Sequence, residues 1–248
     1  MEYTVSDWFG YERRDFRFMG RDALIVLPKG SPNGAPNGRW AVKMEYFGAF
    51  PNLELELLAR GWCVAYLKNV NRWGTDADSD AKAAFVPFMA ERFGLESRFA
   101  CVGMSCGGLC SVNFAAKYPS LVSVLYLDAP VMNLLSCPMG FGEGDRMEGG
   151  WEEIRDAVGF SDLAELLTWR GHPMDRLEPL AEHRIPAALV YGEADKTVPY
   201  LENGAVLERF YRKRGLPLLV AGKPDCGHHP HGLENPKPLA DFIEAWAE

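Results

Sequence analysis

Seven short apolar runs recur along the chain, separated mostly by mixed stretches of helical length. The runs are residues 23–27, 40–46, 62–67, 99–103, 124–127, 187–191 and 218–221. Apolar runs this short, rich in Val, Ala and aromatic residues, are typical of strands buried on both faces. Their alternation with helical stretches predicts an α/β protein with a mostly parallel central sheet and helices on both faces.

Glycine and proline mark where several of the intervening helices end. Segments 52–60 and 81–93 each stop at a glycine, and segment 107–117 stops just before Pro119. Residues 238–248 repeat apolar side chains at helical spacing and predict an amphipathic last helix. These helices connect the predicted strands as a parallel sheet requires.

The alternating pattern breaks between residues 132 and 184. A glycine-rich loop, GFGEGDRMEGG, is followed by helical pieces over residues 151–167 and 174–183. We interpret residues 132–184 as a small helical cap inserted at one end of the sheet. A chain of 248 residues is long enough for one α/β core, so we expect a single domain over residues 1–248.

Charge and composition exclude several function classes. Lys and Arg number 26 against 34 Asp and Glu, a net charge of −8, and no basic run occurs, so nucleic acid and anionic membranes are not expected partners. No signal-peptide pattern or long apolar stretch is found, which predicts a soluble cytoplasmic protein. Six cysteines are then expected to be free thiols rather than a disulfide framework.

The segment Gly103-Met104-Ser105-Cys106-Gly107 follows a predicted strand and opens a predicted helix. In that context G-x-S-x-G is typical of a sharp turn that exposes a nucleophilic serine. Cys106 would then offer its backbone N–H to an oxyanion. Taken alone, the same five residues are equally compatible with a structural glycine-rich turn.

An aspartate and a histidine follow two later strands. Asp195 comes after the run 187–191, and His228 comes after the run 218–221. The carboxyl ends of parallel strands meet at one edge of a sheet, so these side chains and Ser105 are expected to lie close together. Serine, aspartate and histidine in one place are the machinery of nucleophilic acyl transfer.

These motifs resemble those of the α/β-hydrolase superfamily over nearly the whole chain. Asp195 lies in a G-x-x-D-x-x-V-P stretch and His228 in a G-H-x-P stretch. A closer resemblance is to bacterial hydrolases, prolyl-oligopeptidase-like or esterase-like, that carry EFFGAFP-type and GHHPH motifs. Those motifs read here EYFGAFP at 45–51 and GHHPH at 227–231. Members of that group often have arginine after the nucleophile, where this chain has Cys106.

The resemblance implies an α/β-hydrolase fold and a role for each residue. Ser105 would attack the acyl carbonyl, His228 would transfer the proton and Asp195 would orient the imidazole. Asp128 also follows a strand, where some superfamily members place the acid, but the loop around Asp195 matches better. A second oxyanion donor is expected in the loop after the run 40–46, from the N–H of Phe47 or, as second choice, Gly48.

Further residues are candidates for substrate contact. Met104 and the aromatic residues of the loops indicate a largely apolar pocket, and Glu45 either contacts a polar substrate group or pairs with an arginine such as Arg72. The tentative contacts are Glu45, Gly48, Trp73, Met104 and His229.

The three histidines at 228, 229 and 231 also have a spacing that suggests metal ligands. No second cluster of histidines or carboxylates accompanies them, which favours catalysis and loop structure over a metal site. We therefore expect neither a metal nor an organic cofactor.

The sequence favours a serine hydrolase that cleaves a small to medium carboxylic ester, in part because the 248 residues contain no propeller domain. An amidase, thioesterase or aminopeptidase with the same triad stays open, because specificity depends on pocket shape. A ligand-binding protein on a hydrolase scaffold is the other class considered. The sequence does not predict the oligomeric state.

Overall fold

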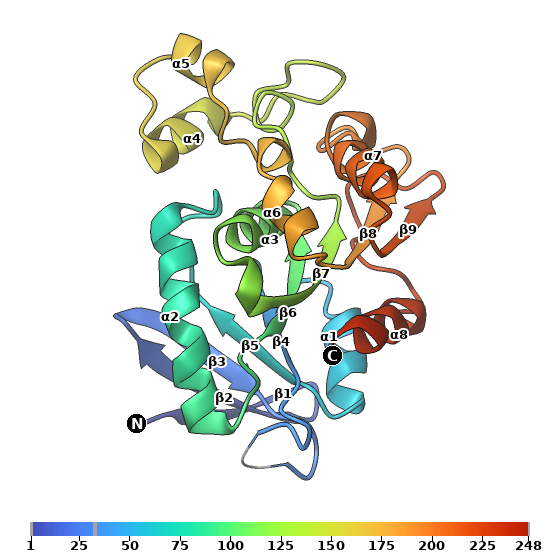
Figure 1. Cartoon of the computed structure of the whole chain (residues 1–248). Coiled ribbons are helices and arrows are strands. Elements are labelled where there is room, and N and C mark those ends of the chain that lie inside the picture. The colour runs from blue at the N-terminus through green and yellow to red at the C-terminus, as the bar shows by residue number, and fades with distance from the viewer. Residues whose placement is uncertain (1, 32–33, 248) are drawn as a thin grey trace.

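The computed structural model describes residues 2–31 and 34–247, and its centre is a nine-stranded sheet in these residues (Figure 1). The strand order is β1-β2-β3-β5-β4-β6-β7-β8-β9. The strands are β1 Thr4–Trp8, β2 Tyr11–Phe18, β3 Arg21–Val26, β4 Trp40–Lys43, β5 Cys63–Leu67, β6 Phe99–Met104, β7 Val122–Asp128, β8 Ala187–Gly192 and β9 Leu218–Lys223. Each of the seven predicted runs overlaps one of these strands.

Strands β5, β4, β6, β7, β8 and β9 pair in parallel, whereas β1, β2 and β3 pair antiparallel at one edge. The sequence analysis missed β1 and β2. In β2, YERRDFRF, only Phe16 is buried. Most of its side chains are charged, so the segment has no apolar run that would predict a strand. The predicted mostly parallel sheet is confirmed, with an antiparallel extension at its N-terminal edge.

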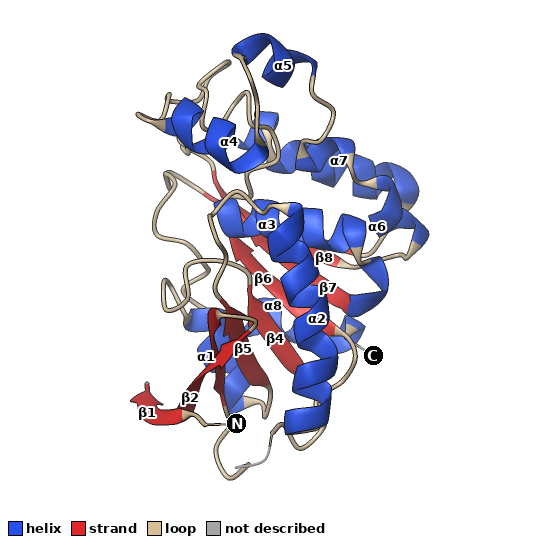
Figure 2. Cartoon of the chain, turned by 90° about the vertical axis from the view of Figure 1, so that its left-hand side faces the viewer, coloured by secondary structure: helices blue, strands red, loops and turns tan. Residues whose placement is uncertain are grey.

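Helices cover both faces of the sheet (Figure 2). On one face lie α2 (Asp76–Phe93), α3 (Cys106–Lys117), α6 (Glu178–Glu182) and α7 (Gly204–Arg214), and on the other α1 (Asn52–Ala59) and α8 (Lys237–Trp246). Short 3-10 turns lie at Pro119–Leu121, Pro173–Asp175 and Tyr200–Glu202. Apolar side chains between the sheet and each helical layer form two cores, as expected for this layered architecture.

The chain between β7 and β8 rises beyond the end of the sheet, where α4 (Gly150–Val158) and α5 (Leu163–Thr168) lie at the top of Figure 1. The helix expected over 151–167 is divided because Gly159 has φ of 90°, which ends α4, and the side chain of Asp162 then caps α5. Glu153 of α4 accepts hydrogen bonds from the Arg72 guanidinium at 2.8 Å and from the indole of Trp73 at 3.1 Å. These bonds tie the cap segment to the loop after β5.

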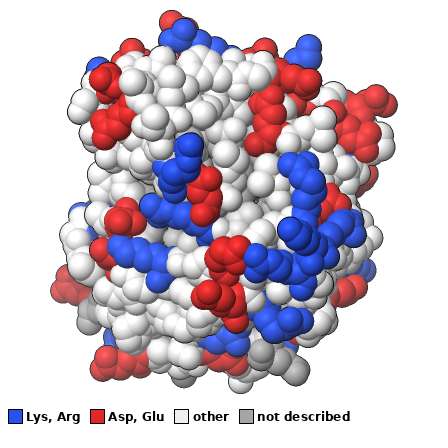
Figure 3. All heavy atoms as spheres, turned by 45° about the horizontal axis from the view of Figure 1, so that its top comes forward, with Lys and Arg blue, Asp and Glu red and all other residues white. Residues whose placement is uncertain are grey.

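Charged side chains of both signs share the face shown in Figure 3, where lysines and arginines lie beside aspartates and glutamates. Among the described residues, no helix combines the length and the apolar character that a membrane crossing requires.

Candidate active site

Ser105 lies at the sharp turn between β6 and α3, with φ of 52° and ψ of −120°. A residue other than glycine rarely adopts positive φ, and such strain is often found at functional sites. The turn is possible because Gly103 has no side chain. A Cβ atom there would lie 2.3 Å from the hydroxyl of Ser111 and 2.4 Å from the carbonyl oxygen of Gly107.

The structure brings Ser105, His228 and Asp195 into one hydrogen-bonded chain. His228 Nε2 lies 3.1 Å from Ser105 Oγ, and His228 Nδ1 lies 2.7 Å from Asp195 Oδ2. The other carboxylate oxygen, Asp195 Oδ1, accepts the backbone N–H groups of Thr197 and Val198, each at 2.9 Å. The side chain of Asp195 is fully buried, so its orientation is fixed.

Asp128 contacts a different histidine. Its Oδ1 lies 3.0 Å from His231 Nδ1, and its Oδ2 accepts hydrogen bonds from the hydroxyl of Tyr126 and the N–H of Gly232. Burial raises the pKa of Asp128, but the hydrogen bonds from His231 and Gly232 outweigh that effect and leave the pKa below its usual value. The acid that orients His228 is therefore Asp195, on geometry.

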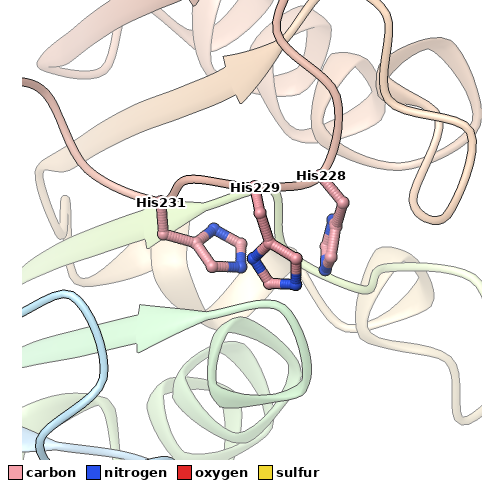
Figure 4. Close-up of side chains that lie close together, drawn as sticks. All are labelled: His228, His229 and His231. Atoms are coloured by element: carbon pink, nitrogen blue, oxygen red, sulfur yellow. The ribbon is translucent and has the colours of Figure 1, made fainter.

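His228, His229 and His231 pack together edge to face (Figure 4), with ring centroids 4.8 to 4.9 Å apart. His229 is exposed and stacks on Phe50 at 5.4 Å, whereas His231 is buried. Burial lowers the pKa of His229, and the neighbouring histidines lower it further. A neutral His229 is therefore favoured at pH 7.

A cavity of about 360 Å³ opens beside Ser105. Trp73, Met104 and His229 line it, as expected for substrate contacts, but Glu45, Phe47 and Gly48 do not. Residues of the cap segment, Cys137 and Met147, form part of the wall. The full lining is Tyr46, Ala49, Phe50, Arg72, Trp73, Met104, Ser105, Cys106, Cys137, Met147, Thr197, His228, His229 and His231.

The turn after β4 places Tyr46, and not Phe47, at this cavity. Tyr46 has φ of 58°, and its phenol lies near the Arg72 guanidinium and the thiol of Cys106, while burial raises its pKa. The ring of Phe47 packs instead against Trp8 and Tyr66. The sequence analysis missed Tyr46, because the direction of a side chain in a turn depends on a backbone angle that the residue types do not reveal.

The side chain of Glu45 does not contact Arg72, and it does not line the cavity beside Ser105. Its carboxylate accepts a hydrogen bond from Asn69, whose side-chain oxygen in turn accepts one from buried Lys82. Arg72 pairs with Glu153 instead. The expected pairing of Glu45 with Arg72 is therefore wrong, and Glu45 belongs to a polar network behind the cavity wall.

Cys106 begins α3, where backbone N–H groups of the first turn have no partner within the helix. Its N–H is therefore available near Ser105 Oγ, and the helix dipole adds partial positive charge there. Burial raises the pKa of its thiol, and a nearby hydrogen bond from Tyr46 only partly offsets this. The thiol is protonated at neutral pH, and all six cysteines are free.

Comparisons with known proteins give the family and the fold. The prolyl oligopeptidase family model matches residues 65–248, and no curated protein sequence gave a significant match. The fold is similar to that of an acylaminoacyl peptidase from Pyrococcus horikoshii, with a TM-score of 0.68 and 15% identity over 95% of this chain. This chain covers only 40% of that peptidase.

A second solved structure is closer in size. An S-formylglutathione hydrolase from Agrobacterium tumefaciens matches with a TM-score of 0.60 and 14% identity, over 99% of this chain and 96% of its own. At these identities the two structures establish the α/β-hydrolase fold, and the family match establishes the kinship. The chain belongs to the prolyl oligopeptidase family of serine hydrolases.

Proposed function

We propose that this protein hydrolyses carboxylic esters of small to medium size through an acyl-enzyme intermediate on Ser105. The observation that carries the proposal is the hydrogen-bonded chain from Ser105 through His228 to Asp195, which opens into a mainly apolar cavity. The proposal takes residues 1–248 as one domain, with residues 132–184 as its cap.

The reaction needs two proton transfers through His228 in acylation and two more in deacylation. Ser105 Oγ attacks the ester carbonyl as its proton moves to His228 Nε2, and the negative charge develops on the carbonyl oxygen. When the tetrahedral intermediate collapses, the bond to the alkoxy group breaks and His228 returns the proton to the leaving alcohol. Water then attacks the acyl carbon as His228 accepts its proton; the bond from the acyl carbon to Ser105 Oγ breaks, His228 returns the proton to Ser105 and the carboxylic acid leaves.

Two hydrogen-bond donors are needed beside the carbonyl oxygen, which becomes negatively charged in the tetrahedral intermediate. The N–H of Cys106 is the first, because it lies at the free start of α3 beside Ser105. For the second, we propose the hydroxyl of Tyr46, a residue that lines the same cavity as Ser105 and Cys106. The N–H of Phe47 stays an alternative donor from the same turn.

The lining of the cavity supports an ester substrate. Among the described residues that line it, none is a carboxylate, so nothing in the cavity matches the ammonium group of a peptide. The one permanently charged side chain, Arg72, is already paired with Glu153. Aromatic, methionine and cysteine side chains suit an acyl chain or an uncharged alcohol.

An aminopeptidase is the second candidate, favoured by an adjoining cavity. Beyond Arg72 and Trp73, a space of about 560 Å³ is bordered by the carboxylates of Glu45, Glu153 and Asp156. Carboxylates favour a cationic group, and here Glu153 already pairs with Arg72, Glu45 with Asn69 and Asp156 with Arg155. A free α-amino group on a short peptide or amino-acid amide would satisfy them.

A labelling experiment combined with a substrate panel tests the proposal. A fluorophosphonate probe is expected to label the protein and to fail with Ser105→Ala, whereas Ser97→Ala, at an exposed serine, keeps full labelling. Hydrolysis of p-nitrophenyl esters is then compared with that of aminoacyl p-nitroanilides. Labelling that persists in Ser105→Ala refutes the nucleophile, and faster cleavage of the anilides favours the aminopeptidase.

A further inference from the structure

The cluster of His228, His229 and His231 contains more imidazoles than the proposed reaction uses. One ligand nitrogen from each of the three lies within 4.8 Å of the others, and Figure 4 shows the rings side by side. Only His228 has a role in proton transfer. His229 and His231 come from the same loop after β9, so the cluster is a local feature of that loop.

Two of these histidines are oriented by buried carboxylates. Asp195 holds Nδ1 of His228 at 2.7 Å, and Asp128 holds Nδ1 of His231 at 3.0 Å. An imidazole that donates its Nδ1 proton to a carboxylate has its Nε2 lone pair free, which is the arrangement typical of metal-bound histidine. Both carboxylates also add negative charge behind the cluster.

We propose that His228, His229 and His231 bind one Zn²⁺ ion, with water in the fourth position, and that this ion inhibits the hydrolase. The inhibition rests on the proposed function. The lone pair of His228 Nε2 that accepts the serine proton is the same one that a metal would take. An enzyme with the ion bound therefore has no general base.

The three ligand nitrogens, now within 4.8 Å of one another, must move closer together to hold the ion. In a tetrahedral site with Zn–N distances of about 2.0–2.1 Å, the ligand nitrogens lie about 3.3 Å apart. His229 can supply this movement because it is exposed and held only by ring contacts, among them its stack on Phe50. His228 and His231 keep the orientation that their carboxylates impose.

The ligand set also sets the choice of metal. Imidazole nitrogens suit Zn²⁺, Cu²⁺ and Ni²⁺, whereas Mg²⁺ and Ca²⁺ prefer oxygen ligands. We therefore expect Zn²⁺ to bind and inhibit at concentrations where Mg²⁺ has no effect. The adjoining cavity of about 360 Å³ gives the ion a path from solvent.

Direct binding is measured in the Ser105→Ala protein, so the readout does not depend on activity. Zn²⁺ is titrated by calorimetry, and Co²⁺ is used as a visible-absorbing probe of a tetrahedral site. We expect a single site. His229→Ala, added to Ser105→Ala, removes one ligand of the ion. It is expected to weaken Zn²⁺ binding by roughly tenfold or more, because loss of a group that only orients a ligand already costs roughly tenfold. His183→Ala, at an exposed histidine outside the cluster, is the matched control.

Asp128→Asn provides a second variant that leaves all three histidines in place. It is expected to weaken Zn²⁺ binding by about 10- to 100-fold, because His231 loses its carboxylate. Absence of binding in Ser105→Ala, or equal affinity in the His229→Ala and His183→Ala backgrounds, overturns the site.

The inhibition is tested on the wild-type protein with its best ester. Zn²⁺ is expected to abolish turnover reversibly, with full recovery on addition of a chelator, and His229→Ala is expected to need a higher Zn²⁺ concentration. Binding without inhibition refutes the inhibitory role. A protein that cleaves no ester but binds Zn²⁺ in the Ser105→Ala background refutes the proposed function alone.

Discussion

Asp195→Asn is the substitution that most directly tests how the site works. The change is isosteric, and the two backbone N–H groups that now bind Asp195 Oδ1 dictate how the new amide sits. Its carbonyl oxygen takes those two donors, so its NH₂ group faces His228 Nδ1. His228 must then carry its proton on Nε2 and has no lone pair for Ser105.

The expected loss follows from that wrong tautomer. Replacement of the triad acid by its amide costs about 10⁴ in kcat, which is about 5.4 kcal/mol of transition-state stabilisation. The fold is expected to survive because both backbone hydrogen bonds are kept. Ester turnover at saturating substrate is measured together with the thermal unfolding midpoint.

Asp128→Asn is the matched control, because Asp128 is equally buried but holds His231. It is expected to lower stability by about 1–3 kcal/mol through poorer pairing of buried groups and to lower kcat by roughly tenfold or less, or about 1.4 kcal/mol. A tenfold loss in Asp195→Asn together with a crippled Asp128→Asn refutes the assignment of the acid.

Three further outcomes are expected. Gly103→Ala should lose about 1–3 kcal/mol of unfolding free energy in denaturant melts, because its Cβ would lie 2.4 Å from the Gly107 oxygen; an unchanged midpoint contradicts this. Glu153→Gln weakens the half-exposed pair with Arg72, so stability should change by under about 1 kcal/mol while hydrogen exchange in α4 quickens; unchanged exchange argues against a tie. Burial lowers the pKa of His172 in the folded protein, so the unfolded chain binds a proton more readily. The free energy of unfolding should therefore fall as the pH drops below about 6.5. His172→Asn should make the free energy of unfolding depend less on pH in this range.

The sequence predicted the parts of the fold that are buried on both faces. Each apolar run overlaps a strand, and all but the edge strand β9 are mainly buried, because only uninterrupted apolar side chains can lie in the centre of a layered sheet. Strand β2 and helix α7, which each have one solvent-exposed face, were missed. Strand β2 carries alternating charges, and α7 buries Leu207 and Tyr211 but has a basic end.

The juxtaposition of Ser105, Asp195 and His228 was predictable because parallel strands deliver their carboxyl ends to one edge. The pairing of Asp128 with His231 was not, since both follow strands at that edge and the residue types suit either partner. Which histidine each aspartate meets depends on how the loop after β9 bends. Tyr46 was missed for the same reason, as its position depends on one positive backbone angle.

Trp73 has a consequence for substrate size. Its buried ring borders the cavity beside Ser105 and two adjoining cavities of about 400 and 560 Å³. The indole therefore separates three neighbouring cavities, and a hydrogen bond to Glu153 of the cap holds it in place. We expect the position of this ring to limit the length of substrate that fits, because a shift of α4 that carries the ring with it would join the separate cavities into one channel.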